Sequence, residues 1–186
     1  MPNVISRAVG RLQREIERTT WLYSQRRQGH RIHSTLEFTG LLPPYPRIQL
    51  GGNCCIERDV TLWFSPDAGA DAKLSLGTEV FIGRNCYVGA FQPVEIGSYA
   101  IIGAYSYIIS ANHCYASREM PIKHQGFTGA PIVIGEDAWL GTRVTVLPGV
   151  TIGMGAIIAG GSVVNKNVPP YEVWGGMPAR FLKARP

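Results

Sequence analysis

The chain has 186 residues, of which 45% are apolar, and it carries a formal net charge of +5. This length suits one domain with an appendage. No apolar run reaches the roughly 18 to 20 residues of a membrane span, and the N-terminus lacks a signal-peptide core, so we expect neither a transmembrane segment nor export. All of the net charge lies in residues 1–31, where seven arginines accompany two glutamates, and no nucleic-acid partner is expected.

Residues 1–47 are predicted to form a basic amphipathic helix followed by an extended lead-in. Apolar side chains recur at near-helical spacing, and arginines fill the opposite side; the apolar positions are Val4, Ile5, Val9, Leu12, Ile16 and Tyr23. Such a helix either packs on the first coil or a neighbouring subunit, or lies on an anionic membrane surface. The sequence leaves both interpretations open.

Residues 48–168 follow a six-residue repeat. Four positions after each aliphatic residue of the repeat stands a small or compact residue, and glycine often follows the aliphatic residue directly. The aliphatic column comprises Leu50, Ile56, Leu62, Leu76, Ile82, Val88, Ile96, Ile102, Ile108, Ile134, Leu140, Val146, Ile152, Ile158 and Val164. Three six-residue repeats form a larger unit of 18 residues, to which insertions are added. Each coil is therefore a triangle of three short strands and three tight corners.

This period predicts an all-β fold, a parallel β-helix of about five 18-residue coils, with the aliphatic column stacked in a narrow core. The corners are expected to need unusual backbone angles, which would explain the glycines. A sandwich of ordinary alternating strands is the alternative. It fits less well, because every insertion falls between whole coils.

The longest interruption, residues 111–131, carries the candidate chemistry. His113 stands at its first bend, and a neutral imidazole can remove a proton from a hydroxyl as that hydroxyl attacks. Loops held by a rigid scaffold commonly carry catalytic groups. Cys114, the next residue, could instead act as an acylated nucleophile.

No metal site is predicted. Zinc carbonic anhydrases also use a β-helix, but they need three histidine ligands, and here only His113 and His124 lie near each other in the interruption. The four cysteines have no CxxC spacing, so reduced thiols in a cytoplasmic protein are expected.

Pro169 and Pro170 end the repeat. Without a cap, the last coil would expose unpaired strand edges and core. We therefore expect residues 169–186 to cover the open end with a short strand and a short terminal helix.

From Ile82 to the C-terminus the chain resembles the hexapeptide-repeat O-acetyltransferases. The segments that carry this resemblance are NHCY, QGFTGAPIVIGEDAWLGTRVTVLPGVTIGMGAIIAGGSVV and VPPYEVWGGMPARFLK. They are most similar to enzymes acting on sugars of bacterial polysaccharide or lipopolysaccharide, and are related to galactoside and maltose acetyltransferases. The resemblance implies a left-handed β-helix, acetyl-CoA as co-substrate, and a homotrimer with active sites between subunits.

The resemblance also implies roles for individual residues. His113 would be the base that lets a sugar hydroxyl attack acetyl-CoA directly. Asn112, His124 and Trp139 would border the substrate, and Thr142 would meet the thioester oxygen, where negative charge develops. The residues that would bind coenzyme A, including its phosphates, are Gly141, Thr142, Ala159, Gly160, Lys166, Arg180 and Lys183.

The expected function is therefore transfer of acetyl to a sugar hydroxyl, in a bacterial surface polysaccharide or its precursor. The enzyme would work in the cytoplasm, either free or held at the inner face of the membrane by the N-terminal helix. Two alternatives remain: an N-acetyltransferase acting on an amino sugar or nucleotide-linked amino sugar, and a non-catalytic β-helix scaffold. Coenzyme A binding separates the enzymes from the scaffold.

Overall fold

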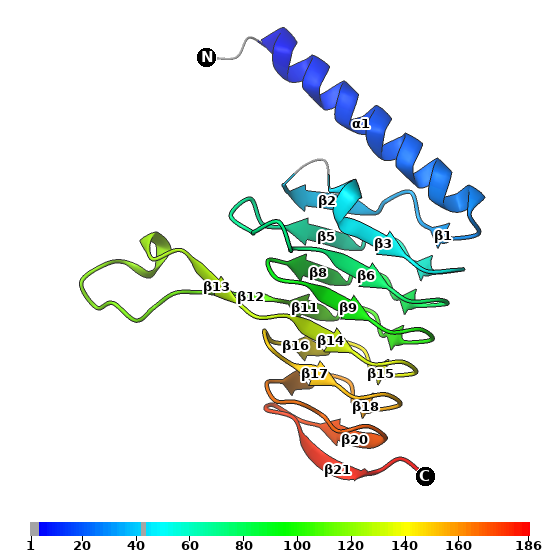
Figure 1. Ribbon diagram of the computed structural model, residues 1–186, viewed down its shortest axis with the longest axis vertical. Coiled ribbons are helices and arrows are strands. Elements are labelled where there is room, and N and C mark those ends of the chain that lie inside the picture. The colour runs from blue at the N-terminus through cyan, green and yellow to red at the C-terminus, as the bar shows by residue number, and fades with distance from the viewer. Residues whose placement is uncertain (1–3, 42–43) are drawn as a thin grey trace.

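The computed structural model describes residues 4–41 and 44–186, which form one helix and a three-sided stack of short parallel strands (Figure 1). The first sheet contains β1 (Arg31–Ile32), β4 (Cys55–Ile56), β7 (Phe81–Ile82), β10 (Ile101–Ile102), β15 (Trp139–Leu140), β18 (Ile157–Ile158), β20 (Glu172–Gly175) and β21 (Arg180–Ala184). The second contains β2 (Glu37–Gly40), β5 (Thr61–Phe64), β8 (Tyr87–Ala90), β11 (Tyr107–Ile109), β16 (Thr145–Val146) and β19 (Val163–Val164). The third contains β3 (Ile48–Leu50), β6 (Leu74–Leu76), β9 (Val94–Ile96), β14 (Ile132–Ile134) and β17 (Thr151–Ile152).

The chain visits the three sheets in turn, so each circuit is one coil of a prism. We call the turn from the first to the second sheet the first corner, and the turn from the second to the third sheet the second corner. Equivalent residues of successive coils are in parallel register, as in Ile102↔Leu140 and Ile108↔Val146. The predicted parallel β-helix is therefore confirmed, and a left-handed one fits this arrangement.

The predicted core is also confirmed. Every residue of the aliphatic column is buried except Leu50, which is half-buried. The small or compact residues that stand four positions after the aliphatic column, which we call the small column, are all buried. They lie inside the corners, for example Cys54, Ala100 and Ser162. Because each coil stacks on the next, these columns form one continuous hydrophobic core.

The expected reason for the glycines was wrong. Positive φ angles occur two residues after the glycines that follow the aliphatic column, at residues such as Asn85, Tyr105 and Arg143. The glycines are required instead by close contact between coils. A Cβ at Gly103 would lie 2.5 Å from the carbonyl carbon of Gly141, a distance that no side chain tolerates.

The prism begins earlier than the predicted boundary at residue 48. β1 pairs with β4 through Ile32↔Ile56, and β2 pairs with β5 through Phe38↔Leu62. Residues 31–50 therefore form an additional first coil, where a lead-in was expected. The second half of that segment holds a short 3-10 helix, η1 (Tyr45–Arg47).

The predicted N-terminal helix is present as α1 (Val4–Arg27), and it lies across the end of the prism above β1 and β2 (Figure 1). Leu22 is buried, and the Trp21 ring packs edge-on against Phe38 at 5.4 Å between ring centroids. Helical packing on the first coil is thus confirmed for the C-terminal half of α1. Within the described residues, no helix is both long and apolar enough to cross a bilayer.

The expected terminal helix was wrong: a strand takes its place. β21 turns back and pairs antiparallel with β20, which closes the first sheet, and the described part of the tail contains no helix. Arg185 fastens this cap, because its guanidinium forms an ion pair with Asp137 at 2.8 Å and donates to the Gly155 carbonyl at 3.0 Å. The strand satisfies the exposed edge of β20 directly, which a helix could not do.

Candidate functional site

The interruption at residues 111–131 is an antiparallel hairpin that projects from the second corner of the prism (Figure 1). Its strands are β12 (Ala111–His113) and β13 (Phe127–Gly129), with His113 opposite Phe127. The His113 imidazole is exposed and lies against the Phe127 ring, with 4.4 Å between ring centroids. Asn112 is exposed and opposite Thr128. The hairpin thus holds the imidazole on a paired strand and not on a loose loop.

Two polar residues that the sequence did not single out hold the hairpin in place. Ser110 is fully buried at its base, where its hydroxyl accepts from the backbone N–H groups of Phe91 and Gln92, both at 3.0 Å. Gln125 closes the outer end, because its side chain exchanges hydrogen bonds with the backbone of Ser117 and also donates to the Met120 carbonyl. These bonds fix the orientation of β12 and therefore of His113.

His124 does not join His113. It ends a short 3-10 helix, η2 (Ile122–His124), at the outer part of the hairpin, and its side chain is exposed. No hydrogen bond or ring contact connects the two histidines among the described residues. The predicted role of His124 beside the acceptor therefore has no geometric support within one chain.

The predicted coenzyme A residues lie mostly along the first corner. Gly141 and Thr142 form this corner between β15 and β16, and Ala159 and Gly160 form the same corner one coil later. The Gly161 N–H donates to the Thr142 carbonyl at 2.8 Å, so the two coils touch here. Trp139 enters the corner from β15 with its side chain half exposed. The result is a line of backbone with little side-chain cover.

Thr142 presents one free backbone donor. Its hydroxyl donates to the Ala104 carbonyl at 2.7 Å, which braces this corner against the preceding coil. Its backbone N–H makes no hydrogen bond in the described part of the chain. Because a fixed, unpaired N–H stabilises a developing oxyanion, the amide of Thr142 suits that role better than its hydroxyl.

The candidate residues therefore divide into two groups on two corners. Asn112 and His113 belong to the second corner, whereas Trp139, Gly141, Thr142, Ala159 and Gly160 belong to the first. The strands of the second sheet run between the two corners, since β16 starts after Thr142 and β11 ends before the hairpin. Among the described residues no hydrogen bond or ring contact joins the two groups, which we call the two half-sites of the candidate site.

The three basic residues are distributed between these half-sites. Arg180 begins β21 opposite Gly175, close to the first corner of the last coil. Lys183 continues a row across the first sheet through Trp139↔Ile157, Ile157↔Val173 and Val173↔Lys183. Three strand spacings of about 4.8 Å put it roughly 14 Å from Trp139. Lys166 follows β19 at the second corner, two coils beyond the hairpin.

The cysteines are free thiols, as expected. Cys54 and Cys86 are buried in the corner column and donate to the carbonyls of Gly77 and Gly103, at 3.1 and 3.2 Å. Burial raises the pKa of Cys86 to about 11. Cys114 is half-buried beside His113. No cluster of three or more metal-ligating side chains occurs in residues 4–41 and 44–186.

Known protein families and individual proteins are similar to this chain in sequence. Residues 131–166 match the family described as "Bacterial transferase hexapeptide (six repeats)", and residues 73–109 match "Hexapeptide repeat of succinyl-transferase". The putative colanic acid biosynthesis acetyltransferase WcaF of Escherichia coli is 36% identical over 113 residues, covering 61% of this chain and 59% of WcaF. The galactoside O-acetyltransferase of E. coli is 32% identical over 114 residues, covering 59% and 56% of the two chains.

Solved structures extend the match along the chain. A hexapeptide-repeat acetyltransferase from Vibrio cholerae, solved with acetyl coenzyme A, is 26% identical and has a TM-score of 0.57, covering 99% of this chain and 91% of that one. The maltose O-acetyltransferase of Clostridium difficile is also 26% identical, with a TM-score of 0.67 and coverage of 76% and 72%. The N-acyltransferase AntD of Bacillus cereus shares the fold, with a TM-score of 0.69 and 18% identity over 86% of this chain and 81% of that chain.

The chain spans about three fifths of WcaF and of the galactoside enzyme, so these relatives contain further sequence outside the match. The two family matches, at residues 73–109 and 131–166, contain hexapeptide repeats on either side of the hairpin and the first corner at Gly141 and Thr142. The repeat, the stacked corners and these matches together identify the chain as a hexapeptide-repeat protein that is similar to bacterial acetyltransferases.

Proposed function

We propose that this protein transfers an acetyl group from acetyl-CoA to a sugar hydroxyl, directly and with His113 as the general base. The observation that carries this proposal is the division into half-sites: an exposed imidazole on a braced hairpin, and a bare backbone corner with the free Thr142 amide. Both half-sites lie in a chain whose relatives include acetyltransferases of colanic acid biosynthesis and of galactosides. A polysaccharide sugar or its precursor is the proposed acceptor.

The chemistry follows from the two half-sites. The neutral His113 imidazole removes the proton from the acceptor hydroxyl while its oxygen forms a bond to the thioester carbonyl carbon. The Thr142 amide donates to the carbonyl oxygen, where charge develops. Collapse of the tetrahedral intermediate breaks the carbon–sulfur bond, and the thiolate of coenzyme A leaves and takes up a proton.

A second copy of the chain completes the site in this proposal. Neither corner contains both the base and the oxyanion donor, and a rigid prism cannot fold one corner onto the other. In a symmetric trimer, each prism can present its second corner to the first corner of its neighbour. Lys166, which lies on the hairpin's corner, would then approach coenzyme A from the neighbouring subunit.

The first test is coenzyme A binding followed by an acceptor screen. Isothermal titration should detect coenzyme A, and release of free thiol from acetyl-CoA should report turnover with each candidate sugar. Sugars with a hydroxyl acceptor are expected to react, and amino sugars belong in the same screen. Turnover with amines only would reassign the protein as an N-acetyltransferase, and absence of coenzyme A binding would refute an enzymatic role.

We also propose that α1 contacts the inner face of the membrane. Val9, Leu12, Ile16 and Tyr23 are each about 60% exposed and recur at spacings that place them on one side of the helix. Arg11, Arg14 and Arg18 lie on the other side, where they line a hollow between α1 and the first coil. The apolar stripe is thus the surface of α1 that faces away from the prism.

Flotation with anionic vesicles tests this contact. Leu12→Gln should reduce the fraction of protein that floats, whereas Arg14→Gln, on the opposite side, should reduce it less. Equal flotation of wild type and Leu12→Gln would contradict membrane contact through the stripe. If the protein instead associates with itself without vesicles, and Leu12→Gln abolishes that association, the stripe would be a contact with another copy of the chain.

A further inference from the structure

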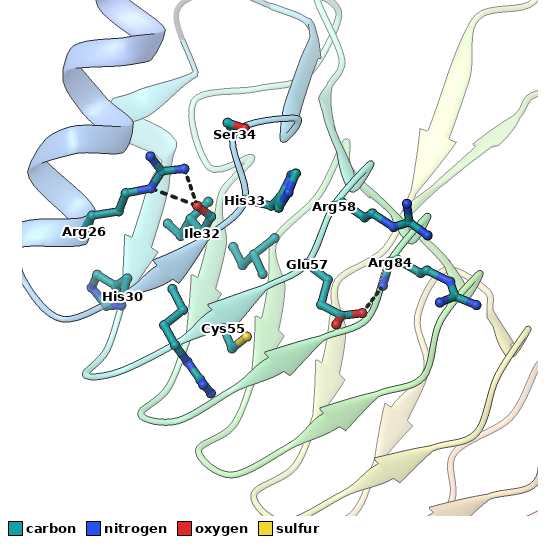
Figure 2. A pocket seen from close by; sticks show the side chains of 11 residues that line it. Arg26, His30, Ile32, His33, Ser34, Cys55, Glu57, Arg58 and Arg84 are labelled. Atoms are coloured by element: carbon teal, nitrogen blue, oxygen red, sulfur yellow. Dashed lines mark hydrogen bonds between the residues drawn. The ribbon is translucent and has the colours of Figure 1, made fainter.

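A hollow in the described structure lies at the N-terminal end of the first corner, and neither His113 nor Thr142 lines it. Its volume is about 690 Å³, and its walls come from the end of α1, the first coil and the next two first corners (Figure 2). Four of its lining residues are arginines, and one is acidic. These charged residues are Arg26, Arg31, Arg58, Arg84 and Glu57.

The guanidinium groups of this hollow have no acidic partner. None of the four forms an ion pair in the part of the chain that the structure describes. The Glu57 carboxylate accepts instead from the backbone N–H of Arg84 at 3.0 Å. Arg26 donates to the Ile32 carbonyl, whereas Arg58 and Arg84 extend in the same direction from successive coils (Figure 2). The lining therefore carries four positive charges and one negative charge, a balance that suits an anion with more than one charge.

The first corner connects this hollow to Thr142. Successive corners are joined by backbone bonds, from Tyr105 N–H to the Arg84 carbonyl and from Arg143 N–H to the Ala104 carbonyl, both at 2.9 Å. The Tyr105 ring lies between two cations, 5.8 Å from the Arg84 guanidinium carbon and 5.6 Å from that of Arg143. Arg84 is two coils from Thr142, on the order of 10 Å at the usual strand spacing.

We propose that the hollow binds the diphosphate of a carrier-linked sugar, and that the sugar extends along the first corner to the Thr142 amide. This inference rests on the proposed function and specifies its acceptor. Guanidinium groups bind phosphate oxygens in pairs, which a neutral free sugar cannot use. The volume suits a ligand of nucleotide size. The separation between Arg84 and Thr142 leaves room for a short saccharide between the phosphates and the reacting carbonyl.

The test is isothermal titration with inorganic pyrophosphate, performed with coenzyme A at saturation so that its own phosphate site is filled. Arg58→Gln combined with Arg84→Gln should weaken pyrophosphate binding at least about ten-fold. Arg27→Gln is the matched control, because it removes one of the exposed arginines at the end of α1 that does not line the hollow. Its binding should stay within about two-fold of wild type.

Three results would overturn the proposal: wild type that does not bind pyrophosphate, a double variant that binds it as well as wild type, and a control that loses as much as the double variant. Failure of the function itself is seen separately, in the coenzyme A titration that precedes each experiment. A protein that binds pyrophosphate but not coenzyme A would keep the anion site and refute the acetyltransferase.

Two kinds of carrier share this chemistry, and competition distinguishes them. Uridine diphosphate represents a nucleotide sugar, and a polyprenyl diphosphate in detergent micelles represents a lipid carrier. Displacement of pyrophosphate by the first assigns the acceptor to a soluble nucleotide sugar, and displacement by the second alone assigns it to a lipid-linked one. Displacement by neither contradicts a carrier diphosphate.

Discussion

The first corner and the β12–β13 hairpin present chemical groups in opposite ways. The first corner is made by repetition, and glycines such as Gly103 and Gly141 let the backbone of one coil lie directly on the next. Around Gly141 and Gly160 it therefore offers backbone donors. The hairpin departs from the repeat and offers a side chain, His113, held by the bonds of Ser110 and Gln125. In this protein, repetition positions backbone dipoles, and interruption positions a titratable group.

The largest expected effect is on turnover, and it distinguishes the catalytic role of the hairpin from the cofactor-binding role of the first corner. His113→Ala should lower turnover at least about 100-fold, the usual scale for loss of a general base, while coenzyme A affinity stays near wild type. Steady-state rates and titration measure these quantities. His124→Ala, on the same hairpin, is the matched control and should change turnover only a few-fold. A loss of coenzyme A binding in His113→Ala would place the hairpin in the cofactor site instead.

Substitutions in the first corner should lower the free energy of unfolding. Gly103→Ala places a Cβ 2.5 Å from the Gly141 backbone, so the coils must separate. Overpacking of this kind costs about 1–3 kcal/mol, which urea denaturation measures. Gly69→Ala is the control, because no heavy atom lies within 4 Å of its added Cβ, and it should change stability by less than about 0.5 kcal/mol. Equal effects of the two variants would mean that the coils are not in contact at the corner.

A smaller effect concerns His30, which occupies the small corner column of the first coil. Its buried Nδ1 accepts from the Cys54 backbone N–H at 3.1 Å, and burial lowers the pKa of this imidazole from 6.5. The unfolded chain then binds a proton that the folded chain does not, so the free energy of unfolding should fall as the pH drops below about 6.5.

His30→Gln keeps an acceptor at this position but cannot titrate. Its urea midpoint should therefore change less than that of wild type between neutral pH and about pH 5. The same pH dependence in both proteins would exclude His30 as the source.

The smallest expected effect separates the two routes for acetyl transfer on the hairpin. In direct transfer Cys114 carries no acetyl group, so Cys114→Ser should leave turnover within about two-fold of wild type. Free-thiol release from acetyl-CoA, corrected for the protein's own thiols, measures this. An inactive Cys114→Ser protein with normal coenzyme A affinity would favour the covalent route.

Most of the prism was predictable because its core position recurs at a fixed period. Every residue of the six-residue column from Ile56 to Val164 is buried. The first coil carried the same signal, since Ile32 and Phe38 precede Ile56 and Leu62 by 24 residues each. That signal was missed because Pro44 occupies the next position of the column and no glycine follows Ile32 or Phe38.

The candidate site was predictable in its members but not in its arrangement. The phase within a coil determines the corner, so Thr142, two residues after Leu140, and His113, five residues after Ile108, belong to different corners. The supports of the hairpin, Ser110 and Gln125, have no periodic signal because they bond to backbone that is distant in sequence. The predicted terminal helix was wrong because the sequence shows that an edge is open but not whether a helix covers it or a strand pairs with it.

Subunit complementation tests most directly whether two chains share each site. His113→Ala is co-expressed with a first-corner variant that combines Trp139→Ala with Thr142→Pro, which removes the backbone N–H. Mixed oligomers are isolated by separate affinity tags. Each isolated mixed trimer should recover one of its three sites, roughly a third of the wild-type sites, because only one interface joins an intact His113 to an intact corner. Turnover well above that of either inactive parent is the predicted result. Mixed oligomers no more active than the parents would show that each chain builds its site alone, contrary to the two half-sites described here.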